Sequence, residues 1–356
     1  MAERILMTGN EAMAEGAIRA GCRHYYGYPI TPQNEVPEYM SRRMSEVGGT
    51  FIQSESELAA INMVLGAAAA GMRAMTSSSS PGISLKLEAI SYMAGQQLPG
   101  VIANIQRGGP GLGEICASQA DYFQAVKGGG HGDYQLIVLA PSGVQEMADM
   151  GTLAFDLADR YRNPVMILSD AQIGQMMEPI VWHEYTEPSD LPEKDWALTG
   201  AKGRPKRIIR SFFLKHGFLE KHNIMLQEKY ARIREREVRY EETAVADAEV
   251  VIVAYGSAAR IAKDVVSRRM KGSKVGLLRP ITLWPFPGKR IRELAEAGKD
   301  FIVAEMSAGQ MVEDVRLAVE GRSRVGFYGR IGGGFVTVDE MTEKAREMLA
   351  ARGARK

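Results

Sequence analysis

Residues 25–43, "YYGYPITPQNEVPEYMSRR", change from one pattern to another at a single short turn. The first residues are aromatic and apolar, as in a buried strand, whereas those from Gln33 onward mix apolar and charged side chains as a helix does. Pro29 and Pro32 enclose Thr31 at the junction. Pro32 restricts the backbone of Thr31 and suits the first turn of a following helix. The stretch therefore predicts a strand, a rigid turn and a helix, and Thr31 either belongs to the turn or is held there for a ligand.

The same alternation of strand and helix patterns extends over roughly the first 170 residues. Strand patterns occupy residues 24–30, 49–54, 72–77, 100–107, 135–140 and 164–170. Helix patterns occupy residues 9–19, 33–44, 57–70, 85–94, 119–126 and 144–161. Such alternation is typical of a parallel α/β sheet, in which ligands bind at the carboxyl ends of the strands.

The alternation stops at Met176 and resumes at Glu249. Within this gap, "YTEPSDLPEKDWALTGAKGRPKR" contains three prolines and many charges, and "EKYARIREREVRYEE" predicts a charged, exposed helix. Beyond the gap, "KVGLLRPITLWPFP" predicts a strand and then an irregular loop, and the last helix is expected over residues 338–351. We therefore predict a first α/β domain over 1–185, an irregular excursion and linker over 186–245, and a smaller α/β domain over 246–356.

Composition and charge exclude several classes of function. Lys plus Arg number 44 and Asp plus Glu 43, which gives no reason to expect nucleic acid or a membrane surface as a partner. The two cysteines, Cys22 and Cys116, form no C-x-x-C pair, so we expect no zinc or iron–sulfur site in this chain. Glu3 and Glu11 interrupt the N-terminal segment, which does not resemble a secretory signal. We expect a cytoplasmic protein.

Polar residues follow several of the predicted strands. In "TSSSSPGISLK" four serines, residues 77–80, precede Pro81 and Gly82. They can offer hydroxyls and backbone N–H groups to a polar ligand, or they can simply cap a helix. The run of four favours a ligand surface.

Arg107 ends a predicted strand in "IANIQRGGPGLGE" and can bind a carboxylate with both arms of its guanidinium. Pairing with an internal acid is the alternative. The glycines that begin at Gly108 lack the G-x-G-x-x-G spacing of a dinucleotide site. His131, in "KGGGHGDY", lies in a glycine-rich loop, where a lone histidine is more often structural than catalytic.

Glu57 lies near the start of a helix in "QSESELAAINMVLGAAAAG", and its spacing alone indicates a carboxylate that stabilises the helix dipole. In "VAYGSAAR", Gly256 and Ser257 could open a phosphate site, but no P-loop lysine follows and a structural role is favoured. The chain has no G-D-G motif with a following asparagine, no nucleophile elbow and no H-E-x-x-H. Such partial sites predict a protein that completes its site with a partner.

Taken together, "GYPITPQ", "ESELAAINMVLGAAAAG", "TSSSSPGISLK", "QRGGPGLG" and "SQADYFQAVKGGGHGDY" resemble one family over nearly the whole chain. It is the alpha-type subunit of the 2-oxoacid:ferredoxin oxidoreductases, which use thiamine diphosphate. "PEYMSRR" and "KVGLLRPITLWPFP" resemble the 2-oxoisovalerate branch. The resemblance implies an α/β fold with a transketolase-like, pyrimidine-binding first domain and a transketolase C-terminal-like second domain.

The resemblance also implies roles for single residues. Glu57 matches the glutamate that hydrogen-bonds the aminopyrimidine nitrogen and so activates the cofactor. Glu55, two residues earlier, is the competing assignment. Thr31 and Arg107 match residues that contact the 2-oxoacid, the arginine at its carboxylate. Pro29, Ile30, Ser79 and Ser80 are further cofactor candidates, Tyr28, Glu55, Gly108 and His131 form a second tier, and no metal ligand is expected.

The implied reaction is oxidative decarboxylation of a 2-oxoacid to acyl-CoA, CO2 and reduced ferredoxin, by an enzyme active only with its partner subunits. A beta subunit would hold Mg2+, the diphosphate and an iron–sulfur cluster. A gamma-type and a small ferredoxin-like subunit would complete the complex, with coenzyme A as co-substrate. The alternatives are the same reaction on 2-oxoglutarate, pyruvate or an aryl 2-oxoacid, or a non-catalytic scaffold. A stand-alone nucleotide-dependent dehydrogenase is disfavoured by the missing fingerprint.

Overall fold

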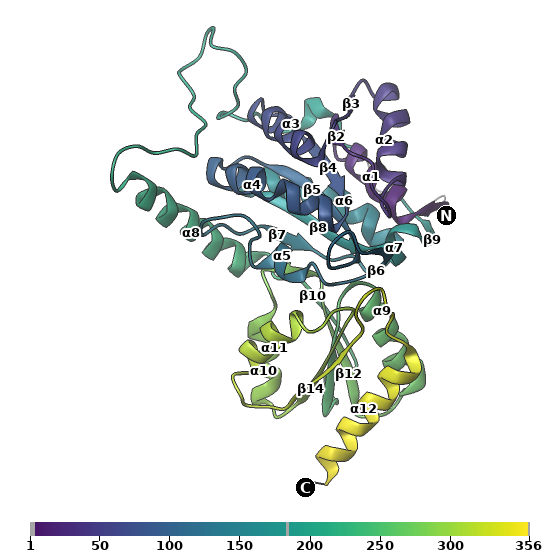
Figure 1. The fold of residues 1–356 in the computed structure, drawn as a ribbon. Helices are drawn as coiled ribbons and strands as arrows, with labels where there is room; N and C mark the ends of the chain where they lie inside the picture. The colour runs from purple at the N-terminus through teal and green to yellow at the C-terminus, as the bar shows by residue number, and fades with distance from the viewer. Residues whose placement is uncertain (1–3, 183–184, 355–356) are drawn as a thin grey trace.

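The computed structural model describes residues 4–182 and 185–354 and contains two α/β bodies joined at a narrow waist (Figure 1). The larger body is built on an eight-stranded sheet and the smaller on a five-stranded sheet. Both sheets are mostly parallel, which confirms the predicted fold class.

The strand order of the large sheet is β13-β7-β8-β5-β4-β2-β3, and β6 pairs with β5. Strands β4, β5 and β8 are buried along their whole length, as expected for a parallel sheet covered on both faces. The strands are β2 (His24–Gly27), β3 (Thr50–Gln53), β4 (Ala74–Ser78), β5 (Gly100–Gly108), β6 (Glu114–Ala117), β7 (Ile137–Leu139), β8 (Pro164–Asp170) and β13 (Thr282–Trp284).

In the described residues, helices α1 to α7 alternate with the strands of this sheet, and α8 (Phe218–Arg236) packs against the same body. Two of them, α1 and α6, have the bounds that the sequence predicted, and they cross at Gly16 and Gly151. A Cβ atom on Gly16 would collide with the Ala148 carbonyl oxygen, so glycine is what allows the close approach. The helices are α1 (Gly9–Arg19), α2 (Glu35–Glu46), α3 (Glu57–Ala69), α4 (Ser80–Gln96), α5 (Tyr122–Val126), α6 (Val144–Tyr161) and α7 (Ala171–Gln175).

The smaller sheet has the order β10-β12-β11-β14-β15. Its strands are β10 (Tyr240–Thr243), β11 (Val250–Val253), β12 (Val275–Pro280), β14 (Asp300–Glu305) and β15 (Val325–Gly329). Its helices are α9 (Gly256–Asp264), which continues as a π-helix (Val265–Arg269), α10 (Gly288–Glu296), α11 (Met311–Val319) and α12 (Val338–Gly353).

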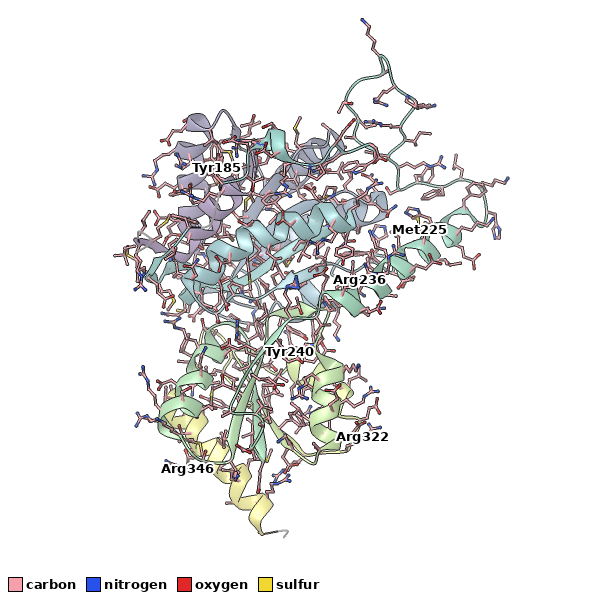
Figure 2. All side chains as sticks on the ribbon, turned by 180° about the vertical axis from the view of Figure 1, so that it is seen from behind. Tyr185, Met225, Arg236, Tyr240, Arg322 and Arg346 are labelled. Atoms are coloured by element: carbon pink, nitrogen blue, oxygen red, sulfur yellow. The ribbon has the colours of Figure 1, made fainter. Side chains whose placement is uncertain are left out.

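The segment predicted as an irregular excursion is more ordered than expected. It is preceded by β9 (Met177–Ile180), which pairs antiparallel with β1 (Ile5–Thr8), and it contains a short 3-10 helix (Pro188–Asp190). Helix α8 (Phe218–Arg236) begins well before the predicted charged helix and buries one face through Leu226, Tyr230 and Ile233. The residues after Arg236 turn at the waist into β10, where Figure 2 labels Arg236 and Tyr240. The charged helix predicted over residues 228–242 is therefore confirmed as far as Arg236, but it belongs to a longer helix with a buried face, and the residues from Tyr240 onward form a strand instead.

The loop expected after β12 contains β13, which crosses to the large sheet and pairs antiparallel with β7. Thr282 lies opposite Leu139, and Trp284 lies opposite Val138. Three residues can form a strand here because the backbone N–H and C=O groups on the outer side of β7 supply the hydrogen-bonding partners. The domain boundaries proposed from sequence stay predictions, and one segment of the second predicted domain completes the first sheet.

The starts of α2 and α4 differ from expectation, and both lie next to predicted site residues. Helix α2 begins at Glu35, so Pro32 lies in the preceding turn and not in the first turn of the helix; the peptide bond between Thr31 and Pro32 is cis. Helix α4 begins at Ser80, five residues before the predicted start at Leu85. Pro81 stands in its first turn, where a missing N–H costs nothing.

None of the helices within 4–182 and 185–354 combines the length and apolar character needed to cross a membrane.

Candidate active site

The carboxyl edge of the large sheet gathers four polar segments. In the sheet order β3-β2-β4-β5, Glu57 follows β3, Thr31 follows β2, Ser78 ends β4 and Arg107 lies one residue from the end of β5. Since parallel strands end at one edge, residues far apart in sequence become neighbours here.

Arg107 is brought directly to the Thr31 turn. Its side chain is 6% exposed, and its Nη1 atom donates to the Thr31 carbonyl over 2.9 Å. Nη2 donates to the Leu112 carbonyl over 2.8 Å. Within the described ranges Nε has no hydrogen-bond partner and no carboxylate pairs with the guanidinium. The two carbonyls therefore orient Arg107 without neutralising its charge.

Glu57 opens α3, whose N-cap Ser56 accepts the Ala59 N–H over 3.2 Å. The Glu57 side chain is 6% exposed, whereas Glu55 is exposed, so burial separates the two competing carboxylates. The Glu57 carboxylate lies against Gly82: a Cβ there would be 2.5 Å from Oε1. No residue in the described part of the chain hydrogen-bonds this carboxylate.

The serine run is divided by its contacts. Ser78 and Ser79 carry buried hydroxyls that have no partner among the described residues, although Ser79 stands at the N-cap of α4. Ser80 instead donates to Asp121 over 2.6 Å and accepts the Arg107 N–H over 3.1 Å. Ser79 is thus available to a ligand, while Ser80 is engaged within the protein.

These groups fit a polar ligand. A buried polar atom without a partner costs about 1–3 kcal/mol, so a cluster of them at one sheet edge indicates a site where a ligand supplies the missing bonds. The free carboxylate of Glu57 and the free hydroxyls suit the ring nitrogens of the thiamine diphosphate pyrimidine, and Arg107 suits an anionic group. In residues 4–182 and 185–354 no cluster of His, Cys, Asp or Glu could hold a metal ion.

The turn before α2 is fixed by Gln33. Its side-chain amide donates to the Tyr28 carbonyl over 3.3 Å, and its backbone N–H donates to the Ile30 carbonyl over 3.1 Å. Tyr28 and Pro29 are exposed and Ile30 is half-buried, so this turn can form a wall of the site.

His131 and Gly108 lie in other surroundings. His131 is exposed and contacts Ser91, 3.4 Å from Nδ1, far along α4 from Ser80. Eleven residues of helix separate the two serines by roughly 16 Å, so the structure does not bring His131 to the other candidates. Gly108 faces a loop of the smaller body, since a Cβ there would lie 3.1 Å from the Gly333 nitrogen.

Sequence reasoning missed Lys86. Its side chain is 0% exposed, and Nζ donates to Thr76 Oγ1 over 2.6 Å and to the Ser77 carbonyl over 3.0 Å. Burial lowers the pKa of this amine to about 7, and the negative charge of Glu57 acts in the opposite direction. The signal was present: Lys86 lies three residues after Ile83 and four before Ile90, on the buried face of α4.

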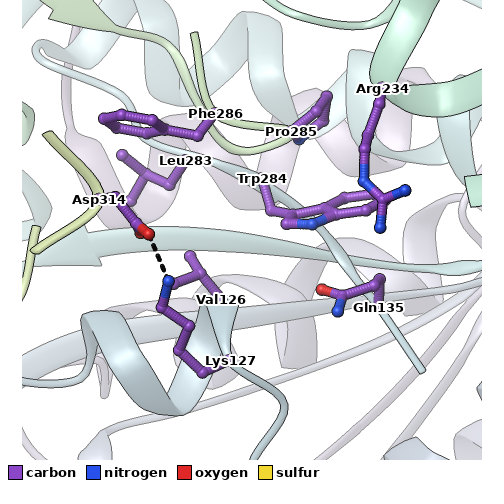
Figure 3. A pocket seen from close by; sticks show the side chains of 9 residues that line it. All are labelled: Val126, Lys127, Gln135, Arg234, Leu283, Trp284, Pro285, Phe286 and Asp314. Carbon is purple, nitrogen blue, oxygen red and sulfur yellow. Dashed lines mark hydrogen bonds and ion pairs between the residues drawn. The ribbon is translucent and has the colours of Figure 1, made fainter. Parts of the chain in front are cut away.

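Cavity size alone does not locate the site. A pocket of about 400 Å³ lies at the waist and contains none of the predicted site residues (Figure 3). In it Lys127 pairs with Asp314, and Arg234 lies 5.6 Å from the centre of the Trp284 ring. A second cavity, of about 590 Å³, adjoins the sheet edge and is lined by residues of both bodies, among them Gly109, Asp121, Ser307 and Gln310.

Comparisons with known proteins identify the family of the chain. Residues 15–244 match the family model described as pyruvate flavodoxin/ferredoxin oxidoreductase, thiamine diphosphate binding, and residues 248–341 match pyruvate:ferredoxin oxidoreductase core domain II. The chain is 54% identical to the ketoisovalerate oxidoreductase subunit VorB of Methanothermobacter marburgensis, across 96% of this chain and 97% of that one. It is 38% identical to the 2-oxoglutarate synthase subunit KorA of Methanocaldococcus jannaschii, across 92% and 95%.

Solved structures give the same result. The 2-oxoglutarate:ferredoxin oxidoreductase of Magnetococcus marinus, with 2-oxoglutarate, coenzyme A and succinyl-CoA bound, superposes with a TM-score of 0.84 at 27% identity. That match covers 97% of this chain, which spans 65% of the length of the other. A split-gene transketolase matches with a TM-score of 0.61 at 13% identity, which confirms the predicted transketolase-like fold.

Proposed function

This chain belongs to the pyruvate flavodoxin/ferredoxin oxidoreductase family, and from that premise we propose that it is the alpha-type subunit of a CoA-dependent 2-oxoisovalerate:ferredoxin oxidoreductase. The observation that carries this proposal is the arrangement at one sheet edge. The Glu57 carboxylate has no hydrogen-bond partner in the described part of the chain, and the Arg107 guanidinium is held beside Thr31 with its charge unpaired there.

Thiamine diphosphate, when bound, supplies the electron sink that decarboxylation of a 2-oxoacid requires. In this proposal Glu57 shares a proton with the ring nitrogen of the aminopyrimidine, which is the acid–base contribution of this chain. Ser79, Pro29 and Ile30 line the ring. Arg107 binds the substrate carboxylate with the N–H groups left free by its two carbonyl contacts, and the exposed Thr31 hydroxyl contacts the same substrate.

We infer the substrate from the relatives. Identity to the ketoisovalerate subunit is 54%, against 38% for the 2-oxoglutarate subunit, over similar shares of the chain. We therefore rank a branched aliphatic 2-oxoacid first and 2-oxoglutarate second. The second candidate needs a further cation for its distal carboxylate, and Lys86 is buried in bonds to Thr76 and Ser77.

The remaining parts of the site are assigned to other subunits. VorB and KorA are named as subunits, so the enzymes that contain them have more than one chain. We propose a beta subunit with Mg2+, the diphosphate site and an iron–sulfur cluster, together with gamma-type and small ferredoxin-like subunits. Coenzyme A is the acyl acceptor, ferredoxin the electron acceptor and the cytoplasm the location in this proposal.

A substrate panel on the purified complex tests the proposal. CoA-dependent reduction of a viologen dye would be measured with 2-oxoisovalerate, 2-oxoglutarate, pyruvate and an aryl 2-oxoacid. We expect the highest kcat/KM with 2-oxoisovalerate. A higher value with 2-oxoglutarate would replace the substrate and leave the reaction class intact.

The scaffold alternative needs a separate measurement. A complex that lacks activity with every 2-oxoacid, and binds thiamine diphosphate equally well when Glu57 is replaced by glutamine, would be non-catalytic at this site. Loss of activity in that variant, with the complex still assembled, would exclude a scaffold role.

A further inference from the structure

A lysine amine and a carboxylate approach the same buried place from two helices. The Glu57 carboxylate, on α3, lies over Gly82 of α4. Lys86 is one helical turn further along α4, and residues four apart lie on the same face. The lysine is 0% exposed, so its charge is shielded from water.

The amine is anchored by uncharged groups. Its bonds go to the Thr76 hydroxyl and the Ser77 carbonyl, both on β4. Ser77 is itself fixed, because its hydroxyl lies 2.7 Å from the Tyr25 hydroxyl and also bonds to Gln33. These two bonds use two of the three N–H donors of the ammonium and orient Lys86. Both acceptors are uncharged, so neither balances the positive charge of the amine.

Glu57 is the charged group that acts on this amine. Burial lowers the pKa of Lys86 to about 7, and the field of Glu57 raises it. Lys229 on α8 provides a comparison within the same chain: it is also buried, and burial lowers its pKa to about 7. Its neighbours Arg162 and Arg232 lower that pKa further, and among the described residues its Nζ donates to the Arg162 carbonyl alone. Among the described residues, a carboxylate therefore acts on the charge of Lys86, whereas the charged groups that act on Lys229 are arginines.

We propose that Lys86 is a positioning residue for Glu57, whose ammonium is the counter-charge that keeps the Glu57 carboxylate ionised and ready for a ligand. This inference rests on the proposed role of Glu57 in the site. A buried carboxylate that loses its counter-charge binds a proton more readily. With Lys86 present, the proton that Glu57 shares with the ring nitrogen is taken up when the cofactor binds. Without Lys86, that proton is already on Glu57 before the cofactor binds.

Proton uptake during cofactor binding is a direct measure of this difference. Thiamine diphosphate with Mg2+ would be titrated calorimetrically into the cofactor-free complex in two buffers of different ionisation enthalpy. The pH is set below the value of about 7 at which the amine loses its charge. We expect uptake of about one proton per cofactor in the wild type and about none in Lys86→Met, because there Glu57 already carries the proton.

Three further variants separate charge from structure. Lys86→Gln keeps a hydrogen-bond donor for Thr76 and Ser77 but removes the charge, so it should behave as Lys86→Met does. It also keeps the test valid if Lys86→Met fails to assemble. Lys229→Met removes another buried lysine, on α8, and should retain the wild-type uptake. Glu57→Gln removes the carboxylate and should take up about no protons.

The outcomes distinguish this inference from the proposed function. Wild-type proton uptake in both Lys86 variants, with lower uptake in Glu57→Gln, would overturn the role of Lys86 and leave that of Glu57 standing. Wild-type uptake in Glu57→Gln would overturn the proposed role of Glu57, and that of Lys86 with it. Loss of uptake in Lys229→Met as well would reduce the effect to a general consequence of replacing a buried lysine.

Discussion

The carboxyl edges of the two sheets carry similar residues but differ in whether their polar side chains have hydrogen-bond partners within the protein. At the edge of the large sheet, Glu57, Ser78 and Ser79 have no hydrogen-bond partners for their side chains within the described residues. At the edge of the smaller sheet, Ser257 donates its hydroxyl to Asp170 over 2.6 Å. Glu305, which is fully buried, accepts the N–H groups at the start of α11 and the hydroxyl of Ser307.

The comparison shows what separates a ligand site from a structural junction. Both edges place a serine and a glutamate at strand-to-helix turns, so residue type does not distinguish them. The edges are distinguished by the number of hydrogen bonds that these side chains make within the protein, because a group already bonded there must give up that bond to bind a ligand. The reading of Gly256 and Ser257 as a structural turn agrees with this, since Asp170 takes both the Ser257 hydroxyl and its backbone N–H.

The largest expected effect comes from Glu57→Gln. Loss of a positioned acid–base group lowers kcat by about 10²–10⁴-fold. The melting temperature should fall only modestly, because the described residues form no hydrogen bond to this carboxylate, although the buried Lys86 amine loses the charge of Glu57. Steady-state dye reduction and calorimetry measure the two quantities. Glu55→Gln, at the exposed neighbour, is the matched control, and equal loss in both variants would contradict the assignment.

Arg107→Gln is expected to have the next largest effect. A hydrogen bond to a charged group contributes about 1.5–3 kcal/mol, which corresponds to a loss of roughly 10–150-fold in kcat/KM for the 2-oxoacid. Arg107→Lys keeps the charge but not the two-armed geometry, and it should fall between wild type and Arg107→Gln. Unchanged kcat/KM in both variants would remove Arg107 from the substrate site.

Glu305→Gln tests the edge of the smaller sheet. The amide cannot accept all the N–H groups that the carboxylate accepts, so unfolding should become easier by about 1–3 kcal/mol. The KM for the 2-oxoacid should stay at its wild-type value. Chemical denaturation and kinetics are the measurements, and a large change in KM without loss of stability would reverse the interpretation of this edge.

The smallest effects should come from a pair of serines. Ser257→Ala removes a buried bond to Asp170 and should cost about 0.5–1.5 kcal/mol of stability. Ser79→Ala removes a hydroxyl that has no partner in the described residues, so stability should be unchanged or slightly higher while thiamine diphosphate binds more weakly. Denaturation curves and cofactor titration check the pair. Equal stability losses would show that the two edges do not differ as described.

Sequence analysis predicted the bounds of an element correctly where its pattern of apolar residues was long. The bounds of α1, α6 and β8 agree with the expected segments, because their apolar spacing runs over whole elements. The short strands β9 and β13 were missed, since each exists by pairing with a distant partner, β1 and β7, that local pattern does not reveal.

The candidate site was only partly accessible to sequence analysis. The positions of Thr31, Glu57 and Arg107 at one edge follow from parallel topology. The preference for Glu57 over Glu55 came from the family resemblance, and the burial of Glu57 supports it. Lys86 escaped notice because lysine ordinarily indicates surface, although its spacing from Ile83 and Ile90 placed it on the buried face of α4.

The crossing of β13 from one body to the other makes the chain hard to divide. A fragment that ended before the second body would leave β7 as an open strand edge, with unpaired N–H and C=O groups that could recruit other chains. Production of the first body by itself would therefore invite aggregation, however well its own core is packed. For expression, the two bodies are therefore best kept in one chain.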